Sequence, residues 1–393
     1  MSQEKARIQL VEALRDGRIE RREFLRGALG LGMSVGTIGL VLQACGSEEK
    51  PADAPPPAGH EGTGPGPAPA PEPELGPIEA DLHIYMWSDY IAEDTIPNFE
   101  KEFNVKVTLD TYESNEEMIA KVQTGAAGYD LVCPSGYAVS VLRHLHLVEQ
   151  LVKKHIPNYA NLAPLFLGSV FDPKNEVTVP WQWGVTGVAY RKDLLGKVPD
   201  SWALFQDAAL KGKLTMMDDM RDNIGAWLRF LGKSVNSVDA ADLAAAKAEA
   251  LKAKPILASY VSAPVKAQLI AGDVFAAQLW NGDTMQAKVE KAEIEFALPK
   301  EGSSIWCDSM CIPKGAKNLR AAHEFLNYIL RPEVGAKISD FTGYGSPNLP
   351  ASEKMVNKVA YPTEADMKNL EYNEDLGAGT AAWDQIWTEI KSG

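Results

Sequence analysis

The fold is decided by a stretch that starts at Leu82-His83-Ile84-Tyr85-Met86-Trp87, a run that predicts a β-strand. Strands and helices then alternate, with a helix over 94–103, a strand over 105–109, a helix over 114–124 and a strand over 129–133. The second helix opens with Ser114-Asn115-Glu116-Glu117, which has the Ser-x-x-Glu form of a capping box. Such alternation predicts an α/β protein with a mostly parallel, covered sheet.

The alternation continues through the rest of the chain. Strands are predicted over 214–217, 274–280 and 294–298, and helices over 222–231, 240–254 and 317–330. We find no internal repeat, so a repeat architecture is not expected.

Length and composition favour a folded, acidic protein. The chain has 393 residues, enough for two domains, and 45% of them are hydrophobic. With 39 basic and 53 acidic side chains its formal charge is −14, which argues against nucleic acid as a partner. Four cysteines are too few for a disulfide framework in a chain of this length.

The N-terminal segment, residues 1–45, reads as an export signal. Arg21-Arg22 precedes a charge-free run of 18 residues over 27–44, and the pair followed by Phe24-Leu25 resembles a twin-arginine signal. The run ends in Leu42-Gln43-Ala44-Cys45, which resembles a bacterial lipobox and marks Cys45 as the residue that takes a lipid. A transmembrane anchor is the alternative, because 18 residues can just span a bilayer. The five glycines in the run favour a cleaved signal.

Residues 46–79 are predicted to be a disordered tether. The stretch over 51–77 contains ten prolines and five glycines in 27 residues and has no apolar period. Proline at this density favours extended, semi-rigid chain, so the segment would hold the globular body away from a membrane.

Catalytic signatures are missing from the sequence. It contains no Gly-x-Ser-x-Gly elbow, no His-Glu-x-x-His and no phosphate loop, so we expect no enzyme activity and no cofactor. A metal site is not expected either, because His144 and His146 would diverge on a helix. Pairing of Cys133 with Cys307 or Cys311 stays open at this point.

Aromatic and acidic residues gather at the ends of predicted strands. The segments are Trp87-Ser88-Asp89-Tyr90, Ser135-Gly136-Tyr137, Asp218-Asp219-Met220-Arg221-Asp222, Trp280-Asn281-Gly282-Asp283 and Trp306-Cys307-Asp308. In open α/β sheets, ligands bind at the carboxyl ends of strands. Aromatic faces attract cations, and carboxylates pair with ammonium groups. Together these segments predict a site for an elongated organic polycation.

Each of these residues also has a purely structural interpretation. A single Trp is more often part of a core, and a single Asp is usually a solvated turn residue. Asp89 could cap the helix that follows it, and Asp218 or Asp219 could cap the helix over 222–231. The repeated pairing of the two residue types favours the binding interpretation for the set.

From Leu82 to Gly377 the chain closely resembles the bacterial spermidine/putrescine-binding proteins of polyamine ABC transporters. The resemblance is carried by the segments above and by Thr111-Tyr112-Glu113-Ser114-Asn115-Glu116, Tyr129-Asp130-Leu131-Val132, Phe325-Leu326-Asn327-Tyr328 and Leu330-Arg331-Pro332. It implies a two-lobed type II periplasmic-binding-protein fold with a ligand cleft between the lobes. Lobe 1 is then expected over 80–186 plus 307–352, and lobe 2 over 187–306 plus 353–393.

The resemblance also implies roles for individual residues. The methylene chain of a polyamine would lie against Trp87, Tyr90, Tyr137, Trp280, Trp306 and Tyr344. The amines would be bound by Asp89, Asp219, Asp222 and Asp308, and Ser135 would add a polar contact. Asp283 and the Trp-Ser-Asp-Tyr form look more like putrescine-binding members, whereas Asp219 with Asp222 looks more like spermidine-binding members. The number of carboxylates favours spermidine, with putrescine also bound.

The expected function is therefore capture of polyamines by a lipid-anchored, monomeric protein outside the inner membrane, for import through an ABC permease and its ATPase. Two alternatives remain. The same fold could bind another solute, such as a different organic cation or a metal chelate, or the protein could be a polyamine sensor without transport.

Overall fold

The computed structural model describes residues 73–124, 128–262, 264–356, 362 and 364–393. The predicted export signal, Cys45 and residues 46–72 of the predicted tether lie outside these residues. Within the described part of the chain, no helix is both long enough and apolar enough to cross a membrane.

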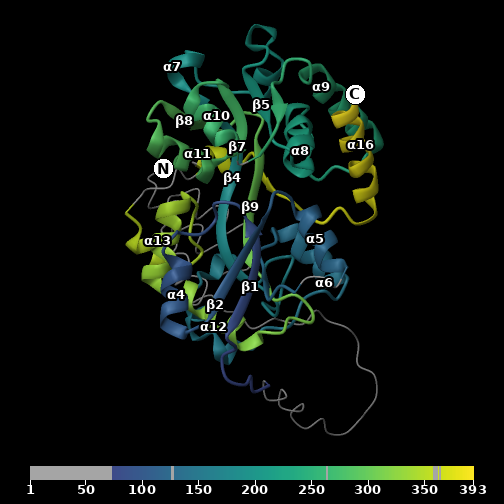
Figure 1. Cartoon of the computed structure of the whole chain (residues 1–393). Helices are drawn as coiled ribbons and strands as arrows, with labels where there is room; N and C mark the ends of the chain where they lie inside the picture. Colours follow the sequence, from purple (N-terminus) through teal and green to yellow (C-terminus); the bar gives the residue numbers. More distant parts are fainter. Residues whose placement is uncertain (1–72, 125–127, 263, 357–361, 363) are drawn as a thin grey trace, which may run out of the picture.

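A small parallel sheet forms one half of the molecule (Figure 1). Its strands are β1 (Asp81–Trp87), β2 (Lys106–Tyr112) and β3 (Leu131–Val132), in the order β2-β1-β3. Leu82 and Ile84 of β1 are buried with Phe99 of α4 on one face, and Tyr85 is buried with Met118 of α5 on the other. This alternation follows from the two-residue period of a strand, and it leaves the sheet covered on both faces.

A larger sheet of seven strands passes from this half into the other. Its order is β10-β9-β4-β7-β5-β6, with β8 also paired to β4. The bounds are β4 (Val179–Arg191), β5 (Leu214–Met216), β6 (Ser259–Tyr260), β7 (Ala276–Trp280), β8 (Ile294–Ala297), β9 (Ser303–Met310) and β10 (Leu370–Tyr372). The prediction of a mostly parallel sheet is wrong here, since β4 is antiparallel to β7, β8 and β9.

Helices surround both sheets. They are α4 (Thr95–Phe103), α5 (Asn115–Gln123), α6 (Gly136–His144), α7 (Lys192–Leu195), α8 (Met220–Phe230), α9 (Ala240–Ala253), α10 (Val265–Ala271), α11 (Asn281–Glu290), α12 (Leu319–Ile329), α13 (Pro332–Thr342), α14 (Leu349–Lys354), α15 (Glu364–Met367) and α16 (Thr380–Ser392). Short 3₁₀ turns lie at 153–155, 157–161, 164–166, 202–206, 208–210 and 377–379.

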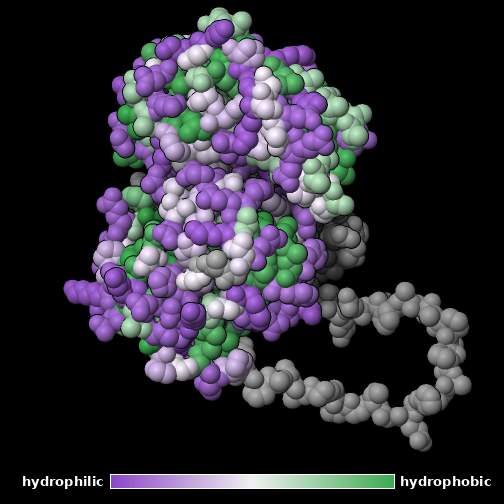
Figure 2. All heavy atoms as spheres, turned by 45° about the vertical axis from the view of Figure 1, so that its right-hand side comes forward, coloured by the Kyte–Doolittle hydropathy of each residue, from purple (hydrophilic) through white to green (hydrophobic). Residues whose placement is uncertain are grey.

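The long strand β4 belongs to two hydrophobic cores. Val179 and Trp181, near its start, are buried in the core that contains α4 and α12. Val188 and Tyr190, near its end, are buried in the core that contains α8, α9 and α16. Figure 1 shows β4 and β9 running together between the two halves. On the face shown in Figure 2, hydrophilic and hydrophobic residues are interspersed over both halves.

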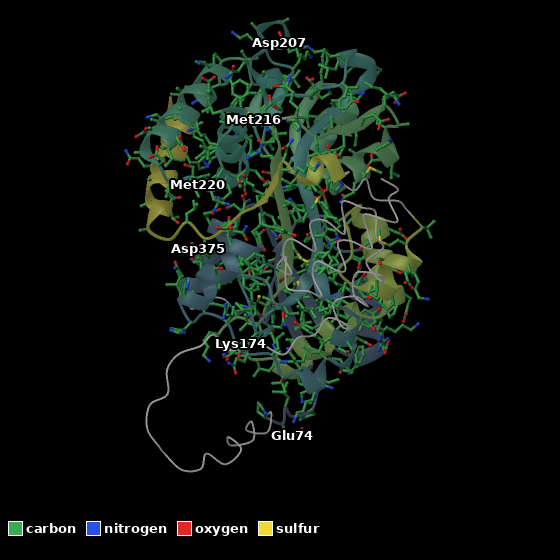
Figure 3. All side chains as sticks on the ribbon, turned by 180° about the vertical axis from the view of Figure 1, so that it is seen from behind. Glu74, Lys174, Asp207, Met216, Met220 and Asp375 are labelled. Atoms are coloured by element: carbon green, nitrogen blue, oxygen red, sulfur yellow. The ribbon has the colours of Figure 1, made fainter. Side chains whose placement is uncertain are left out.

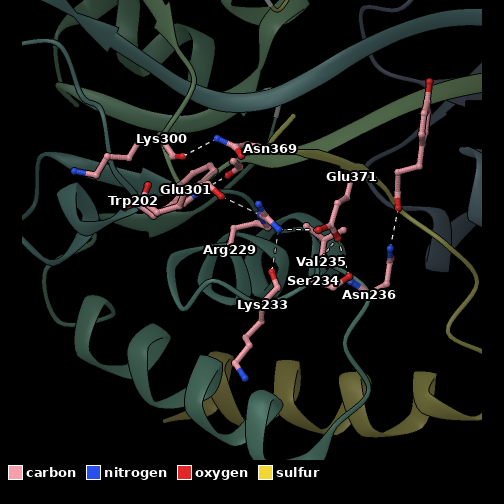
Figure 4. Close-up of polar contacts among 12 residues, drawn as sticks. Trp202, Arg229, Lys233, Ser234, Val235, Asn236, Lys300, Glu301, Asn369 and Glu371 are labelled. Atoms are coloured by element: carbon pink, nitrogen blue, oxygen red, sulfur yellow. Dashed lines mark hydrogen bonds and ion pairs between the residues drawn. The ribbon is translucent and has the colours of Figure 1, made fainter. Parts of the chain in front are cut away.

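Figure 4 shows how the C-terminal part of the chain is attached to α8. Arg229 donates to the Glu301 carbonyl at 3.0 Å and to the Glu371 carboxylate at 2.7 Å. Trp202 Nε1 donates to the carbonyl of Gly302 at 2.9 Å. A Cβ at Gly302, where φ is +92°, would lie 1.9 Å from the Asn369 carbonyl oxygen, so this junction accepts only glycine.

The capping box at Ser114 is confirmed in part. The Ser114 hydroxyl accepts from the backbone N–H of Glu117, as predicted. The Glu117 carboxylate accepts from the N–H of Glu113, one residue before the cap, at 3.3 Å. The strand predicted over 129–133 is shorter, Leu131–Val132, although the backbone N–H of Asp130 still donates to the His83 carbonyl of β1 at 2.7 Å.

Asp130 connects the small sheet to α12. Its buried carboxylate accepts from the backbone N–H groups of His83, Lys317 and Asn318 and from the Asn318 amide, at 2.8 to 3.1 Å. Two distant segments are thereby joined at the start of α12.

We predict that Asp130→Ala lowers the free energy of unfolding by about 2–4 kcal/mol, because it leaves four partly buried donor groups without their acceptor. Urea unfolding monitored by circular dichroism measures the change. Asp200→Ala is the matched control, since the Asp200 side chain is 77% exposed. Equal stabilities for the two variants would contradict the role given to Asp130.

Candidate functional site

A cavity of about 50 Å³ lies where β1, β7, β9 and the start of α8 come together. Its residues come from both sheets, and they include eleven of the twelve ligand-binding residues expected from the sequence: Trp87, Tyr90, Ser135, Tyr137, Asp219, Asp222, Trp280, Asp283, Trp306, Asp308 and Tyr344. Asp89 is the exception. The cavity suits a narrow ligand better than a bulky one.

Aromatic rings pack against one another along the cavity. Tyr344 contacts Tyr90 and Trp306 edge to face, with ring centroids 5.3 and 5.1 Å apart. Trp87 and Trp280 form a second edge-to-face pair at 5.8 Å. Edge-to-face packing holds each ring in place, so the faces that remain open are fixed before a ligand arrives.

Asp308 presents an unpaired oxygen to the cavity. The residue is 4% exposed, and its Oδ2 accepts from the Tyr90 hydroxyl at 2.9 Å. Its Oδ1 is buried and has no hydrogen-bond partner among the described residues. Burial raises the pKa of Asp308 to about 7, although the neighbouring Ser135 and Tyr90 oppose this shift. An incoming ammonium group would supply the missing donor.

Asp222 is held differently, by three uncharged donors. Its Oδ1 accepts from Thr186 on β4 at 2.8 Å and from Ser304 on β9 at 2.7 Å, and its Oδ2 accepts from Trp280 Nε1 at 2.9 Å. These contacts orient the carboxylate and leave its negative charge without a neutralising partner.

Asp219 caps α8, which confirms one of the structural interpretations made from the sequence. Its Oδ1 accepts from the backbone N–H of Asp222 at 2.9 Å. Burial, then the charges of Asp222 and Glu116, raise its pKa well above the usual value. Asp218 lies outside the cavity, with a side chain 47% exposed and paired to Lys391.

Arg221 lines the cavity and was not predicted as a site residue. It is 2% exposed and donates to the Glu374 carbonyl at 2.7 Å. Its guanidinium carbon lies 5.0 Å from the ring centroid of Tyr137 and 4.9 Å from that of Trp383. Arg221 lies in the segment Asp218-Asp219-Met220-Arg221-Asp222, from which only carboxylates were predicted to bind the ligand.

Asp89 is directed away from the cavity toward Lys266, a second residue that the sequence did not indicate. The Lys266 ammonium lies 2.7 Å from Asp89 Oδ2 and 3.3 Å from Asp283 Oδ1. Asp89 has a positive φ of 53°, and it does not cap α4, whose first turn has Asp94 as its cap residue. Burial raises the pKa of Asp283 to about 6, although Lys266 opposes this shift.

Two further questions from the sequence concern the cysteines and metals. Cys133, Cys307 and Cys311 are all buried and free, so neither of the pairings left open is formed. Among the described residues, no group of three or more His, Cys, Asp or Glu side chains could hold a metal ion.

The two cores and the cavity lined from both sheets are typical of a solute-binding protein, and the comparisons with known proteins agree. The family model for bacterial extracellular solute-binding proteins matches residues 95–369, and this chain belongs to that family. The spermidine/putrescine-binding periplasmic protein of Escherichia coli is 35% identical over 319 residues, which cover 79% of this chain and 92% of that protein.

Two solved structures share the two-lobed α/β fold. A putative spermidine/putrescine ABC transporter protein from Listeria monocytogenes has a TM-score of 0.76 at 32% identity and covers 80% of this chain and 99% of its own. The TpPotD lipoprotein of Treponema pallidum has a TM-score of 0.72 at 32% identity, covering 79% and 99%.

The raised pKa of Asp308 predicts how the stability of the ligand-free protein depends on pH. The pKa of Asp308 is about 7 in the folded protein and about 3.9 in the unfolded chain. The contribution of Asp308 to stability is therefore fully present below about pH 4 and is lost as the pH rises through 7. Asp308→Asn removes this dependence. The free energy of unfolding of Asp308→Asn, minus that of the unchanged protein, should therefore increase by about 2–3 kcal/mol from pH 5 to pH 8.

Urea unfolding at both pH values measures this difference. Asp218→Asn, which neutralises an exposed acid outside the cavity, serves as the control. A stability difference for Asp308→Asn that stays constant with pH would contradict the raised pKa.

Proposed function

We propose that this protein captures polyamines, spermidine and/or putrescine, outside the cytoplasm and delivers them to an ABC importer. The observation that carries the proposal is the buried Asp308 carboxylate, whose Oδ1 lacks a partner, in a narrow cavity lined by aromatic rings. The Escherichia coli relative, whose name states that it binds spermidine and putrescine, supports the same ligand class.

The site favours an aliphatic chain with an ammonium group at each end. Asp308 and Asp222 are acids held by neutral donors, so each can accept an ammonium group. The methylenes between the ammonium groups would lie against Trp306, Tyr344 and Tyr90, with Trp87, Trp280 and Tyr137 completing the apolar lining. Cation–π contacts with these rings would each contribute about 0.5–2 kcal/mol.

Closure of two lobes on the ligand is part of the proposal. Lobe 1 would comprise 80–186 plus 307–352, and lobe 2 would comprise 187–306 plus 353–393. The division of β4 between two cores supports a hinge near residues 186–187, and the burial of Trp383 and Trp387 in the second core supports the assignment of the C-terminal segment. The closed monomer would then dock on a permease driven by an ATPase.

The protein would remain attached to a membrane through a lipid on Cys45, after export by the twin-arginine route. Figure 3 places Glu74 at one end of the molecule and Asp207 at the other. Glu74 pairs with Lys154 at 2.5 Å, so the tether would meet lobe 1 at the end far from lobe 2. Attachment there would leave the cleft and both lobes free to move. The structural neighbour from Treponema pallidum is itself titled a lipoprotein.

Calorimetric titration of the body starting at Gly76 with putrescine, cadaverine, spermidine and spermine tests the ligand. We expect saturable one-to-one binding of spermidine and putrescine. Asp308→Asn should weaken this binding by about 1.5–3 kcal/mol, because one hydrogen bond to a charged group is lost. Asp218→Asn is the control and should bind as the unchanged protein does. If folded, ligand-free protein bound none of the four amines, the function would move to another solute or to sensing.

The lipid anchor has its own test. In cells that express the full chain, Cys45→Ala should release the body into the soluble fraction or leave the signal uncleaved, and labelling with radioactive palmitate should be lost. Continued labelling of the Cys45→Ala variant would show that the lipidation site is wrong.

A further inference from the structure

Lys266 is bound on three sides next to Asp283, which lines the cavity, whereas Lys266 itself is not a lining residue. Its ammonium donates to Asp89 Oδ2 at 2.7 Å, to Gln286 Oε1 at 2.8 Å and to Asp283 Oδ1 at 3.3 Å. Only 13% of its side chain is exposed. A lysine ammonium has three N–H donors, and here each has an acceptor. This is the coordination that a ligand ammonium would need if it were bound in the same place.

The acceptors are themselves held in place. The Gln286 amide donates to the Thr342 carbonyl at 2.9 Å and lies 3.4 Å from the Asp89 carbonyl. Asp283 stands in the first turn of α11 and is 3% exposed. The lysine therefore connects the loop after β1 to helices α10 and α11, which cover the larger sheet, in a fixed geometry.

The remaining acids of the cavity are free of such neutralisation. In the described part of the chain, Asp219, Asp222 and Asp308 form no ion pair with a lysine or arginine side chain, whereas Asp283 does. Asp283 is therefore the cavity acid that already has a paired cation. Asp219 is already used as the cap of α8, so a ligand with two ammonium groups can use Asp222 and Asp308, but one with a third must place it elsewhere.

We propose that Lys266 acts as a built-in ammonium group beside Asp283, at the edge of the cavity, and that it selects against polyamines with an additional ammonium near Asp283. Two cations brought side by side repel each other, and the carboxylate they would share is already bound. This inference rests on the proposed polyamine-binding function. It reverses the preference for spermidine that the number of carboxylates suggests, because one of the counted acids is already neutralised and another, Asp89, lies outside the cavity.

The test compares neutral and charged replacements of Lys266 in the mature protein. Lys266→Met keeps the length of the side chain without its charge, and Lys266→Arg keeps the charge. Lys288→Met is the matched control, since Lys288 lies on α11 and pairs with Glu295 outside the site. Affinities for putrescine and spermidine are measured by calorimetry at pH 8, because loss of Lys266 would raise the pKa of Asp283 further above about 6.

We expect the ratio of spermidine to putrescine affinity to rise at least tenfold in Lys266→Met and to stay unchanged in Lys266→Arg and Lys288→Met. Lys266→Gln, which keeps a hydrogen-bond donor, repeats the test if Lys266→Met does not fold. If both amines lost affinity by the same factor, Lys266 would be only a contact that closes the cleft, and the inference would be overturned. An unchanged ratio would overturn it as well. If the unchanged protein bound neither amine, the proposed function itself would fail.

Discussion

Buried negative charge without a matching cation is the constraint on which this site depends. A carboxylate removed from water is stable only if donors or a counter-ion replace the lost solvation. Asp222 satisfies this requirement with three neutral donors, but Asp308 is left with an unpaired oxygen and a pKa near 7. The buried carboxylate of Asp308 therefore carries a free-energy penalty that a cationic ligand would remove. If the two lobes close as proposed, removal of that penalty would couple closure to binding.

The strands that cross between the two halves also build the site. Thr186 on β4 and Ser304 on β9 hold Asp222, and Asp308 is itself part of β9. A change in the angle between the halves would therefore change the hydrogen bonds of the acids directly. If the proposed hinge lies in β4, motion at the hinge would reach the cavity through these same two strands.

Local signals in the sequence predicted the regular elements well. The helices at 95–103 and 240–253 were found within one residue, because apolar spacing and capping residues act over a single turn. The long strand β4 was not predicted, and its antiparallel pairing with β7, β8 and β9 was missed, since pairing between distant strands has no local signature. The contacts of the Asp130 carboxylate with Lys317 and Asn318 were not predicted for the same reason, because these residues lie 187 and 188 positions further along the chain.

The site residues show the same difference between features that short sequence segments predict and features that depend on contacts between distant parts of the chain. Most of its rings and acids were predicted, because they follow strands in short segments that resemble a known family. Lys266 could not be found in this way, because its contact with Asp89 spans 177 positions. Asp89 was assigned to the ligand because its segment resembles the family's motif, and that motif carries no information about Lys266. A carboxylate in a motif shows where charge is available, and only the folded chain shows whether the protein has already used it.

Two cationic side chains, Arg221 in the lining and Lys266 beside Asp283, reduce the number of acids that stay available to a ligand. Arg221 is held by a carbonyl oxygen and by the faces of Tyr137 and Trp383, so its charge offsets nearby acids without occupying their oxygens. Lys266 does the opposite and occupies an oxygen of Asp283 directly. A site with many free acids would attract any cation, metal ions included. When some of these acids are already paired with the protein's own cations, only the remaining acids can bind a ligand. A flexible diamine would match the spacing between the remaining acids, whereas a compact cation would not.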